Sequence, residues 1–309
     1  MDKPEALKKI SAVGYIFLVI FLLVLIFSIS TIFIKKPAAT EVSNKNIVVM
    51  EIKDTLSYKT TMPLVQALRK YAEMPNIRGI LFRINSPGGT VGGVQELYRE
   101  IIEFRKKGKF AVASLGDIAA SGGYYVAMAC DHVVSNPGSI VGSIGVIMNT
   151  FNLSKLAGKY GVERVVIKAG KFKDLLNGFR NIDPAEIRLL QEMVDDSYSQ
   201  FFEAVKKSRK NLSEAKLKEL CDGRVFTGQM AFKNKMVDSL GGFYIALDKL
   251  REIARISGKP EILYHKSRET QDIMKYLRQG AGVNLAEKIK MLFTTGDFAS
   301  PLYYLYMGF

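Results

Sequence analysis

The chain has 309 residues, of which 48% are hydrophobic, and it carries a formal net charge of +14. The positive charges are scattered, with no aromatic-interleaved basic groove and no Gly-Lys-Ser/Thr loop, which argues against a nucleic-acid-binding protein and a P-loop nucleotide site. Two cysteines and two histidines argue against a disulfide framework and a multi-histidine metal centre.

An uncharged apolar segment, Ile10 to Ile34, follows a short polar flank at residues 1–9. It is long enough to cross a bilayer of roughly 30 Å as a helix. It is also longer than the apolar core of a cleaved signal peptide, and no clear Ala-x-Ala site follows it. We therefore predict an uncleaved transmembrane anchor, followed by a linker at residues 35–45. Lysines flank both ends of the anchor, so the positive-inside rule leaves its orientation open.

Strands and helices are predicted to alternate from Asn46 onward. Apolar runs of strand type occupy residues 46–52, 79–84, 110–114, 132–135 and 163–168, and helical spacing marks 62–74, 94–107 and 153–160. This alternation predicts an α/β fold with a largely parallel sheet.

A glycine-rich loop, Asn85 to Gly93, follows the second of these strands. A turn of this kind at the carboxyl end of a strand can cradle a phosphate or present backbone N–H groups to an oxyanion, although many glycine loops are plain connectors. The loop is expected on the same sheet edge as Ser121, because both follow a strand and precede a helix.

Ser121 lies in the segment Asp117 to Tyr125, where a strand and loop give way to an apolar helix. The alanines and glycines beside it remove bulk around its hydroxyl. A helix N-terminus offers free N–H groups and a partial positive charge, which suits a nucleophile whose attack creates an oxyanion. Serine is also a common helix N-cap, so this segment alone leaves both roles open.

A serine nucleophile needs a base. His132 lies in an apolar strand and His265 in a weakly patterned tail, so neither is a convincing partner. Lys171 and Lys173 lie in an otherwise small and apolar loop, and a lysine can serve if burial lowers its pKa enough to leave it neutral. Lys173 is the better placed of the two, although a solvated lysine is the default for either.

Ser143, flanked by glycines, is either a turn residue or a donor near the site. Asp183 is expected to cap the longest soluble helix, with Pro184 at the first helical position and Glu186 completing a capping box. The apolar stripe of this helix is interpreted as core or subunit contact. The stripe consists of Ile187, Leu190, Val194, Tyr198, Phe201 and Val205.

The last nine residues, Pro301 to Phe309, are almost all apolar or aromatic. Side chains of this kind are not expected to remain unpaired in water. We expect this tail to dock on the membrane surface or in the substrate groove of a neighbouring subunit.

Five short motifs occur in order along the chain. They are Asn85-Ser86-Pro87-Gly88-Gly89, Ala119-Ala120-Ser121-Gly122-Gly123-Tyr124-Tyr125, Val141-Gly142-Ser143-Ile144-Gly145-Val146, Gly170 to Asp174, and Asp222-Gly223-Arg224-Val225-Phe226-Thr227-Gly228. Each is weak alone, but the set resembles signal peptide peptidase A in its short, single-copy form. That family consists of membrane-anchored bacterial serine proteases of the Clp/crotonase superfamily. The resemblance covers roughly Asn46 to Ile256.

The resemblance implies a Ser–Lys dyad in which Ser121 is the nucleophile, Lys173 is the general base and Ser143 orients the lysine. It implies a Clp/crotonase-like fold of repeated strand–strand–helix units, preceded by one transmembrane helix. The protease domain would span residues 46–264, followed by a C-terminal extension at 265–309.

The resemblance also implies an oxyanion hole made by the N–H groups of Gly122 and of Gly88 or Gly89, with Gly89 preferred. No metal or cofactor is needed. The substrates would be signal peptides left in the membrane after secretion, bound in extended form with small side chains next to the scissile bond. Strand addition at a sheet edge suits such binding.

The expected location is the inner (plasma) membrane, with one membrane pass and the catalytic domain outside the cell or in the periplasm. The basic composition favours contact with anionic lipid headgroups. The resemblance implies a ring, with eight subunits expected, in which the serine of one subunit meets the lysine of the next.

Three alternative functions stay open at this point. A related Ser–Lys membrane protease cleaves a stomatin-like partner. A crotonase-type acyl-CoA enzyme uses the same superfold without a serine nucleophile. A membrane scaffold would have no catalytic role.

Overall fold

The computed structural model describes residues 45–265 and 303–305. The chain divides into two compact units, residues 1–44 and 45–309, and the description below concerns the second. The predicted anchor at residues 10–34, its flank and most of the C-terminal extension lie outside the described residues. Within the described ranges, no helix combines the length and apolar character that a membrane span requires.

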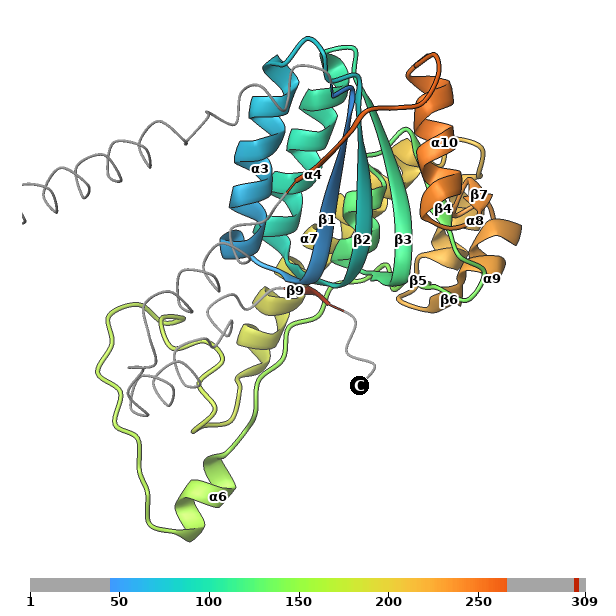
Figure 1. Ribbon diagram of the computed structural model, residues 1–309. Helices are drawn as coiled ribbons and strands as arrows, with labels where there is room; N and C mark the ends of the chain where they lie inside the picture. Colours follow the sequence, from blue (N-terminus) through green and yellow to red (C-terminus); the bar gives the residue numbers. More distant parts are fainter. Residues whose placement is uncertain (1–44, 266–302, 306–309) are drawn as a thin grey trace, which may run out of the picture. The chain divides into compact units, whose positions relative to one another are not determined.

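One sheet of nine strands organises the described chain (Figure 1). Its strands are β1 (Ile47–Leu56), β2 (Gly79–Thr90), β3 (Phe110–Ala120), β4 (His132–Ser135), β5 (Ile140–Gly142), β6 (Val225–Thr227), β7 (Ser239–Leu240), β8 (Ile262–Tyr264) and β9 (Tyr303–Leu305). The main path through the sheet is β6-β5-β3-β2-β1-β8, with β4 beside β3, β7 beside β4, and β9 beside β2.

Eight described helices lie between the strands along the sequence. They are α3 (Tyr58–Glu73), α4 (Val91–Lys106), α5 (Gly122–Ala127), α6 (Ser154–Lys159), α7 (Pro184–Ser208), α8 (Glu214–Leu220), α9 (Gly228–Lys233) and α10 (Phe243–Ile253). From β1 to α5, strands and helices alternate one to one, and β1–β2 and β2–β3 pair in parallel. The α/β prediction is therefore confirmed. Among the described elements, a strand–strand–helix order occurs only at β4–β5–α6, so the predicted repetition of that unit is not seen.

Strand β1 shows how the sheet separates two hydrophobic layers. Val48 and Met50 belong to the larger core, which also contains residues of α3, α4 and α7. Ile47 and Val49 point the other way and pack with Leu250 of α10. Successive side chains of a strand face opposite sides of a sheet, so this alternating apolar strand is buried on both faces. Figure 1 shows α3 and α4 on one side of the sheet and α10 on the other.

Strand β3 bends in the middle, and the bend directs its end toward the candidate site. Its first half pairs with β4, and its second half, from Ile118, pairs with β5. Asn85 stabilises the bend, because its side-chain oxygen accepts hydrogen bonds from the N–H groups of Asp117 (3.0 Å) and Ile118 (3.1 Å). The second half of β3 thereby runs beside β5 and ends at Ala120, directly before Ser121.

The segment between β5 and α7, residues 146–183, runs away from the sheet and is called the arm below (Figure 1). It contains α6, as predicted, but the predicted strand at 163–168 is wrong, because these residues form no regular secondary structure. The arm exposes many large apolar side chains, with Ile167 97% exposed. The others that are strongly exposed include Phe151, Leu156, Tyr160, Val162 and Val165.

The C-terminal tail contributes one described strand. Residues Tyr303–Leu305 form β9, which pairs antiparallel with Gly88–Thr90 at the end of β2. The tail was predicted to dock on a membrane or on a neighbouring subunit. In the structure, its described residues add instead, as β9, to the sheet of their own chain.

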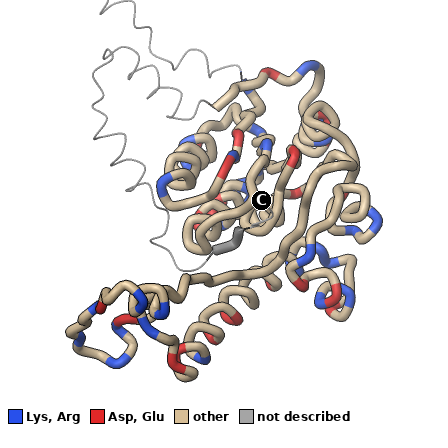
Figure 2. Tube along the Cα trace, turned by 90° about the horizontal axis from the view of Figure 1, so that it is seen from below, with Lys and Arg blue, Asp and Glu red and all other residues tan. Residues whose placement is uncertain are grey.

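Charged residues are distributed over the whole described trace. Figure 2 shows Lys and Arg interspersed with Asp and Glu along the arm and around the sheet, without a continuous basic stripe. Many of these charges are paired locally, as in Lys206–Glu214 (2.6 Å) and Arg209–Asp238 (2.7 Å).

Candidate active site

Ser121 joins β3 to α5 through a strained turn. Its backbone has φ 49° and ψ −116°, a conformation that costs a residue with a side chain about 1–3 kcal/mol. An ordinary N-cap has an extended backbone, and its side chain accepts a hydrogen bond from the first turn. Ser121 has neither feature, since its side chain makes no capping hydrogen bond. The geometry therefore argues against the cap interpretation that the sequence left open.

The turn holds Ser121 close to the sheet edge. Its N–H donates to the carbonyl of Gly142 at the end of β5 (2.7 Å), and the residue is only 1% exposed. A serine on a sharp strand-to-helix turn is the arrangement that presents a nucleophile in several hydrolases. Here the hydroxyl stands at the start of α5, whose first N–H groups have no side-chain cap.

The glycines beside Ser121 allow the start of α5 to touch the end of β2. A Cβ on Gly122 would lie 3.0 Å from the nitrogen of Gly89 and 3.1 Å from the Cα of Gly88. A Cβ on Gly123 would lie 2.6 Å from the carbonyl oxygen of Ser86. The structure therefore brings together Gly88, Gly89 and Gly122, the three residues predicted for the oxyanion hole.

The segment predicted as a loop at Asn85–Gly93 is in fact the end of β2 followed by the first turn of α4, and a buried serine fixes the end of the strand. The Ser86 hydroxyl donates to the carbonyl of Asp54 and accepts from the N–H of Gly88 (3.2 Å). Gly88 has φ 121°, which favours glycine. A Cβ on Gly89 would lie 1.8 Å from the carbonyl oxygen of Leu56, so only glycine fits there. This segment is rigid before any substrate arrives.

Ser143 lies directly after Gly142, the residue that binds the Ser121 N–H. Its own N–H donates to the carbonyl of Arg224 (2.8 Å), and its φ is 50°. It lines a cavity of about 420 Å³ together with Tyr198 of α7 and the Asp222 turn. Ser143 therefore follows a hydrogen-bond partner of Ser121 directly, while its role in orienting Lys173 stays a prediction.

Lys173 lies on the arm with its side chain exposed. Within the described residues, no hydrogen bond joins its amine to Ser121 or Ser143, and its N–H donates to the carbonyl of Gly170 (3.2 Å). A single chain thus places the predicted base on an exposed loop and the predicted nucleophile in a buried turn. Lys171 is also exposed, and its ammonium lies 5.0 Å from the centre of the Phe172 ring.

The two histidines are engaged elsewhere. His132 Nε2 lies 2.9 Å from the hydroxyl of Ser239, and His265 Nδ1 lies 3.0 Å from the hydroxyl of Tyr71. Burial lowers the pKa of both imidazoles. Neither contacts Ser121, in agreement with the interpretation that a histidine is not its partner.

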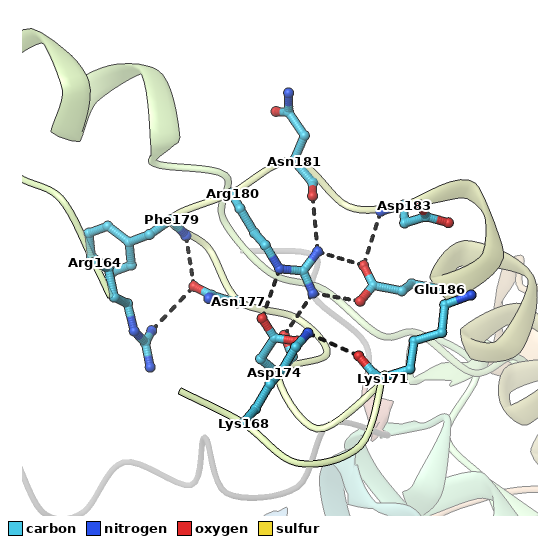
Figure 3. A network of polar contacts seen from close by, with 10 residues as sticks. All are labelled: Arg164, Lys168, Lys171, Asp174, Asn177, Phe179, Arg180, Asn181, Asp183 and Glu186. Carbon is cyan, nitrogen blue, oxygen red and sulfur yellow. Dashed lines mark hydrogen bonds and ion pairs between the residues drawn. The ribbon is translucent and has the colours of Figure 1, made fainter. Parts of the chain in front are cut away.

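A charged network near Lys173 was missed by the sequence analysis (Figure 3). Arg180 binds Asp174 and Glu186, and its hydrogen bonds lower the pKa of Glu186 to about 2 and hold that of Asp174 below its usual range. Glu186 also completes the predicted capping box with Asp183. Asp174, Arg180 and Glu186 are spaced six residues apart, which matches the period of neither a helix nor a strand. The sequence pattern therefore did not indicate that they interact.

The Ser121 turn leads to a stability prediction. Ser121→Gly is expected to have a free energy of unfolding about 1 kcal/mol higher than Ser121→Ala, because glycine adopts this φ without strain. Thermal unfolding of the two full-length variants in detergent measures the difference. The same exchange at Ser135, in a β-strand, is the control, and there glycine should be the less stable residue. An alanine variant at least as stable as the glycine variant at 121 would show that the turn is unstrained.

Comparisons with known proteins show that the chain is similar to peptidases. The model described as peptidase family S49 matches residues 103–257. A Synechocystis sp. protein that is named as a protease is 44% identical over 64% of this chain and 71% of its own length. An Enterococcus faecium protein named as signal peptide peptidase SppA is 31% identical over 74% of this chain and 65% of its own. The chloroplastic serine protease SPPA of Arabidopsis thaliana is 34% identical over 62% of this chain and 28% of its own.

Proposed function

The chain belongs to peptidase family S49 and is a serine peptidase, and we propose that it is a membrane-anchored endopeptidase using a Ser121–Lys173 dyad. Its proposed substrates are signal peptides left in the membrane after secretion, in keeping with the name of the Enterococcus relative. The observation that carries the proposal is the strained Ser121 turn packed against the Gly88–Gly89 loop. A Clp/crotonase-like fold, an anchor at residues 10–34 and an outward-facing catalytic domain belong to the same proposal.

In the proposed mechanism, Ser121 Oγ attacks the carbonyl carbon of the scissile peptide bond while its proton passes to the neutral amine of Lys173. The tetrahedral adduct collapses, the C–N bond breaks, and Lys173 gives the proton to the leaving amine. Water then attacks the ester carbonyl, with Lys173 again accepting the proton. The second adduct collapses, the bond between the acyl carbon and Ser121 Oγ breaks, and Lys173 returns its proton to Oγ, which releases the acid and regenerates the neutral amine. Ser143 would orient the lysine through these steps.

The oxyanion would be stabilised by backbone N–H groups. Gly122 begins α5 and supplies one candidate donor. Gly89 is the better second donor, because the N–H of Gly88 is already bonded to the hydroxyl of Ser86 (3.2 Å). Loss of one donor of this type typically lowers kcat by about 10²–10³-fold. Both proposed donors lie where the start of α5 touches the end of β2, a close contact that supports their assignment to one oxyanion hole.

The substrate is proposed to bind as an added strand. The edge formed by Gly88–Thr90 accepts an antiparallel strand, since β9 pairs there. Main-chain hydrogen bonds of this kind bind an extended peptide whatever its sequence. Because this edge includes Gly88 and Gly89, which lie beside Gly122, a strand added to it would bring one of its peptide bonds next to Ser121.

A composite site between subunits is proposed because one chain leaves the dyad unassembled. Lys173 is exposed on the arm, which also exposes Ile167 and other apolar side chains. The apolar stripe of α7 is only partly buried within the chain. Phe201 and Val205 are buried, whereas Ile187 is exposed. We therefore favour a cyclic homo-oligomer, eightfold by resemblance, in which the arm carries Lys173 to the Ser121 of the next subunit.

Covalent labelling tests the serine. A fluorophosphonate probe is expected to modify the full-length protein in detergent, and Ser121→Ala should lose the label because Ser121 is the proposed nucleophile. Ser154→Ala, at the start of α6, is the control and should label normally. Labelling that survives in Ser121→Ala would remove Ser121 from the reaction. Absence of labelling in every form would favour an acyl-CoA enzyme or a scaffold without a nucleophile.

Deletion of residues 301–309 is expected to lower KM for extended peptide substrates. The deletion removes β9, which occupies the edge proposed for the substrate and competes from within the chain at roughly millimolar effective concentration. Steady-state hydrolysis of a peptide series measures the change, and deletion of residues 306–309 alone is the control that keeps β9. An unchanged KM would show that the tail does not compete with substrate.

A further inference from the structure

We propose that Arg180 is a positioning residue for Lys173, fixing the loop that carries the lysine onto the beginning of α7. The inference rests on the proposed function of Lys173 as the base. Arg180 itself is not placed in contact with the substrate.

The guanidinium of Arg180 binds the residue that follows Lys173 in two ways (Figure 3). Its Nε donates to Asp174 Oδ2 (3.0 Å), and its Nη2 donates to the backbone carbonyl of Asp174 (3.1 Å). The side chain and the main chain of Asp174 are therefore held together. Since Lys173 is covalently joined to Asp174, its Cα has little freedom to move while these bonds persist.

The other side of the guanidinium is fixed to α7. Nη1 donates to Glu186 Oε2 (2.7 Å), and Nη2 donates to Glu186 Oε1 (2.5 Å). Glu186 also accepts from the N–H of Asp183 (3.0 Å), so it is already part of the helix cap. Arg180 thus connects an irregular loop to the first turn of the longest helix in the described chain.

This network differs from an ordinary surface ion pair. The side chain of Glu186 is 5% exposed and that of Asp174 is 11% exposed, whereas isolated exposed pairs contribute little. A two-pronged contact between a guanidinium and a carboxylate also fixes orientation, which a single ammonium cannot do. Arg180 therefore supplies geometry as well as charge.

The network also keeps the neighbouring carboxylate away from the lysine. Arg180 takes one oxygen of Asp174 and Lys168 takes the other, while Lys168 also donates to the carbonyl of Lys171 (2.9 Å). With both oxygens occupied, Asp174 is less able to form an ion pair with Lys173. Such a pair would favour the protonated lysine, which cannot accept a proton.

The test compares Arg180→Gln with Arg164→Gln in the full-length protein. Arg164 lies on the same arm and is exposed. It makes one long side-chain hydrogen bond to Asn177 (3.3 Å), and its guanidinium lies 5.7 Å from the centre of the Phe179 ring, so its replacement matches the charge change and leaves the bonds of Arg180 to Asp174 and Glu186 in place. Arg180→Gln is expected to lower kcat and the rate of fluorophosphonate labelling by about 10- to 100-fold, with KM within about twofold. Its activity should also need a higher pH, because Asp174 is released. Arg164→Gln should behave as the wild type.

Two further variants make the test robust to misfolding. Arg180→Lys keeps the charge but not the fork, and should recover only part of the loss. Glu186→Gln retains a residue that suits a capping box while weakening the contact with Arg180, and should lower kcat in the same direction. A wild-type kcat and an unchanged pH profile in Arg180→Gln would overturn the proposal. If Arg180→Gln does not fold, the same result in both Arg180→Lys and Glu186→Gln would overturn it.

The effect must also disappear when Lys173 is absent. In a Lys173→Ala background, Arg180→Gln should cause no further loss of labelling, because residues acting through one group are not additive. A further tenfold loss would show that Arg180 acts on something else. Wild-type activity of Lys173→Ala alone would instead refute the proposed base. Failure of the inference and failure of the function are therefore distinguishable.

Discussion

Lys173→Arg is expected to lower kcat/KM for peptide hydrolysis by about 10²–10⁴-fold, the contribution typical of a general base. A base must be neutral before it accepts the proton of Ser121, and an arginine side chain stays charged at every pH at which the protein is folded. Size and charge are otherwise similar, so the variant isolates the ability to accept a proton. Steady-state hydrolysis in detergent from neutral to alkaline pH is the measurement.

Lys171→Arg is the matched control for this experiment. Lys171 lies in the same loop and is likewise exposed, and its ammonium lies over the Phe172 ring, a contact that arginine also makes. The control should retain most of the activity. A fully active Lys173→Arg enzyme would mean that the dyad is wrong, even if Ser121 is still labelled.

Mixed assembly of two inactive variants is expected to restore activity. Ser121→Ala and Lys173→Ala subunits are each inactive alone. In a random equal mixture, about a quarter of the sites in a head-to-tail ring would combine an intact serine with an intact lysine from a neighbour. The recovered rate should therefore approach about one quarter of the wild-type rate per site.

The mixture must be shown to contain both subunits in one particle, which native mass measurement on differently tagged chains provides. If the serine and the lysine act within one subunit, no intact pair forms and activity stays near zero. That result in a mixture of proven composition would falsify the composite site, while the dyad itself would stand. Co-assembled wild-type and doubly substituted subunits, with Ser121→Ala and Lys173→Ala in one chain, give the reference for dilution.

The regular elements were predictable because their signals are local. Asp183, Pro184 and Glu186 form a helix start whose hydrogen bonds lie within four residues, and the structure contains that capping box. The alternation of strands and helices was likewise predictable from apolar periodicity. The apolar run at 163–168 misled because strand character is completed only by a partner strand, and the described chain offers none to the arm.

The site was predictable in its members but not in its geometry. The sequence indicated that Ser121 and the Gly88–Gly89 loop share a sheet edge, and the structure places them in contact. It could not distinguish an N-cap from a nucleophile turn, because the backbone angles of Ser121 depend on β5 and α5 together. The contacts of Arg180 could not be predicted from the sequence, because they depend on the path of an irregular loop.

The pairing of β1 with β8 has a consequence for how the chain is made. β1 is the first described strand, yet its edge at Ile47–Val49 pairs with residues 262–264, which are synthesised more than two hundred positions later. Until then, the Ile47–Val49 edge presents unpaired main-chain groups, the kind of surface on which strands of other molecules assemble. Protection of this edge of the nascent sheet therefore depends on β8, a strand that is made late. A chain that is cut before Tyr264, by a premature stop or by proteolysis, should accumulate as aggregate rather than as a smaller enzyme.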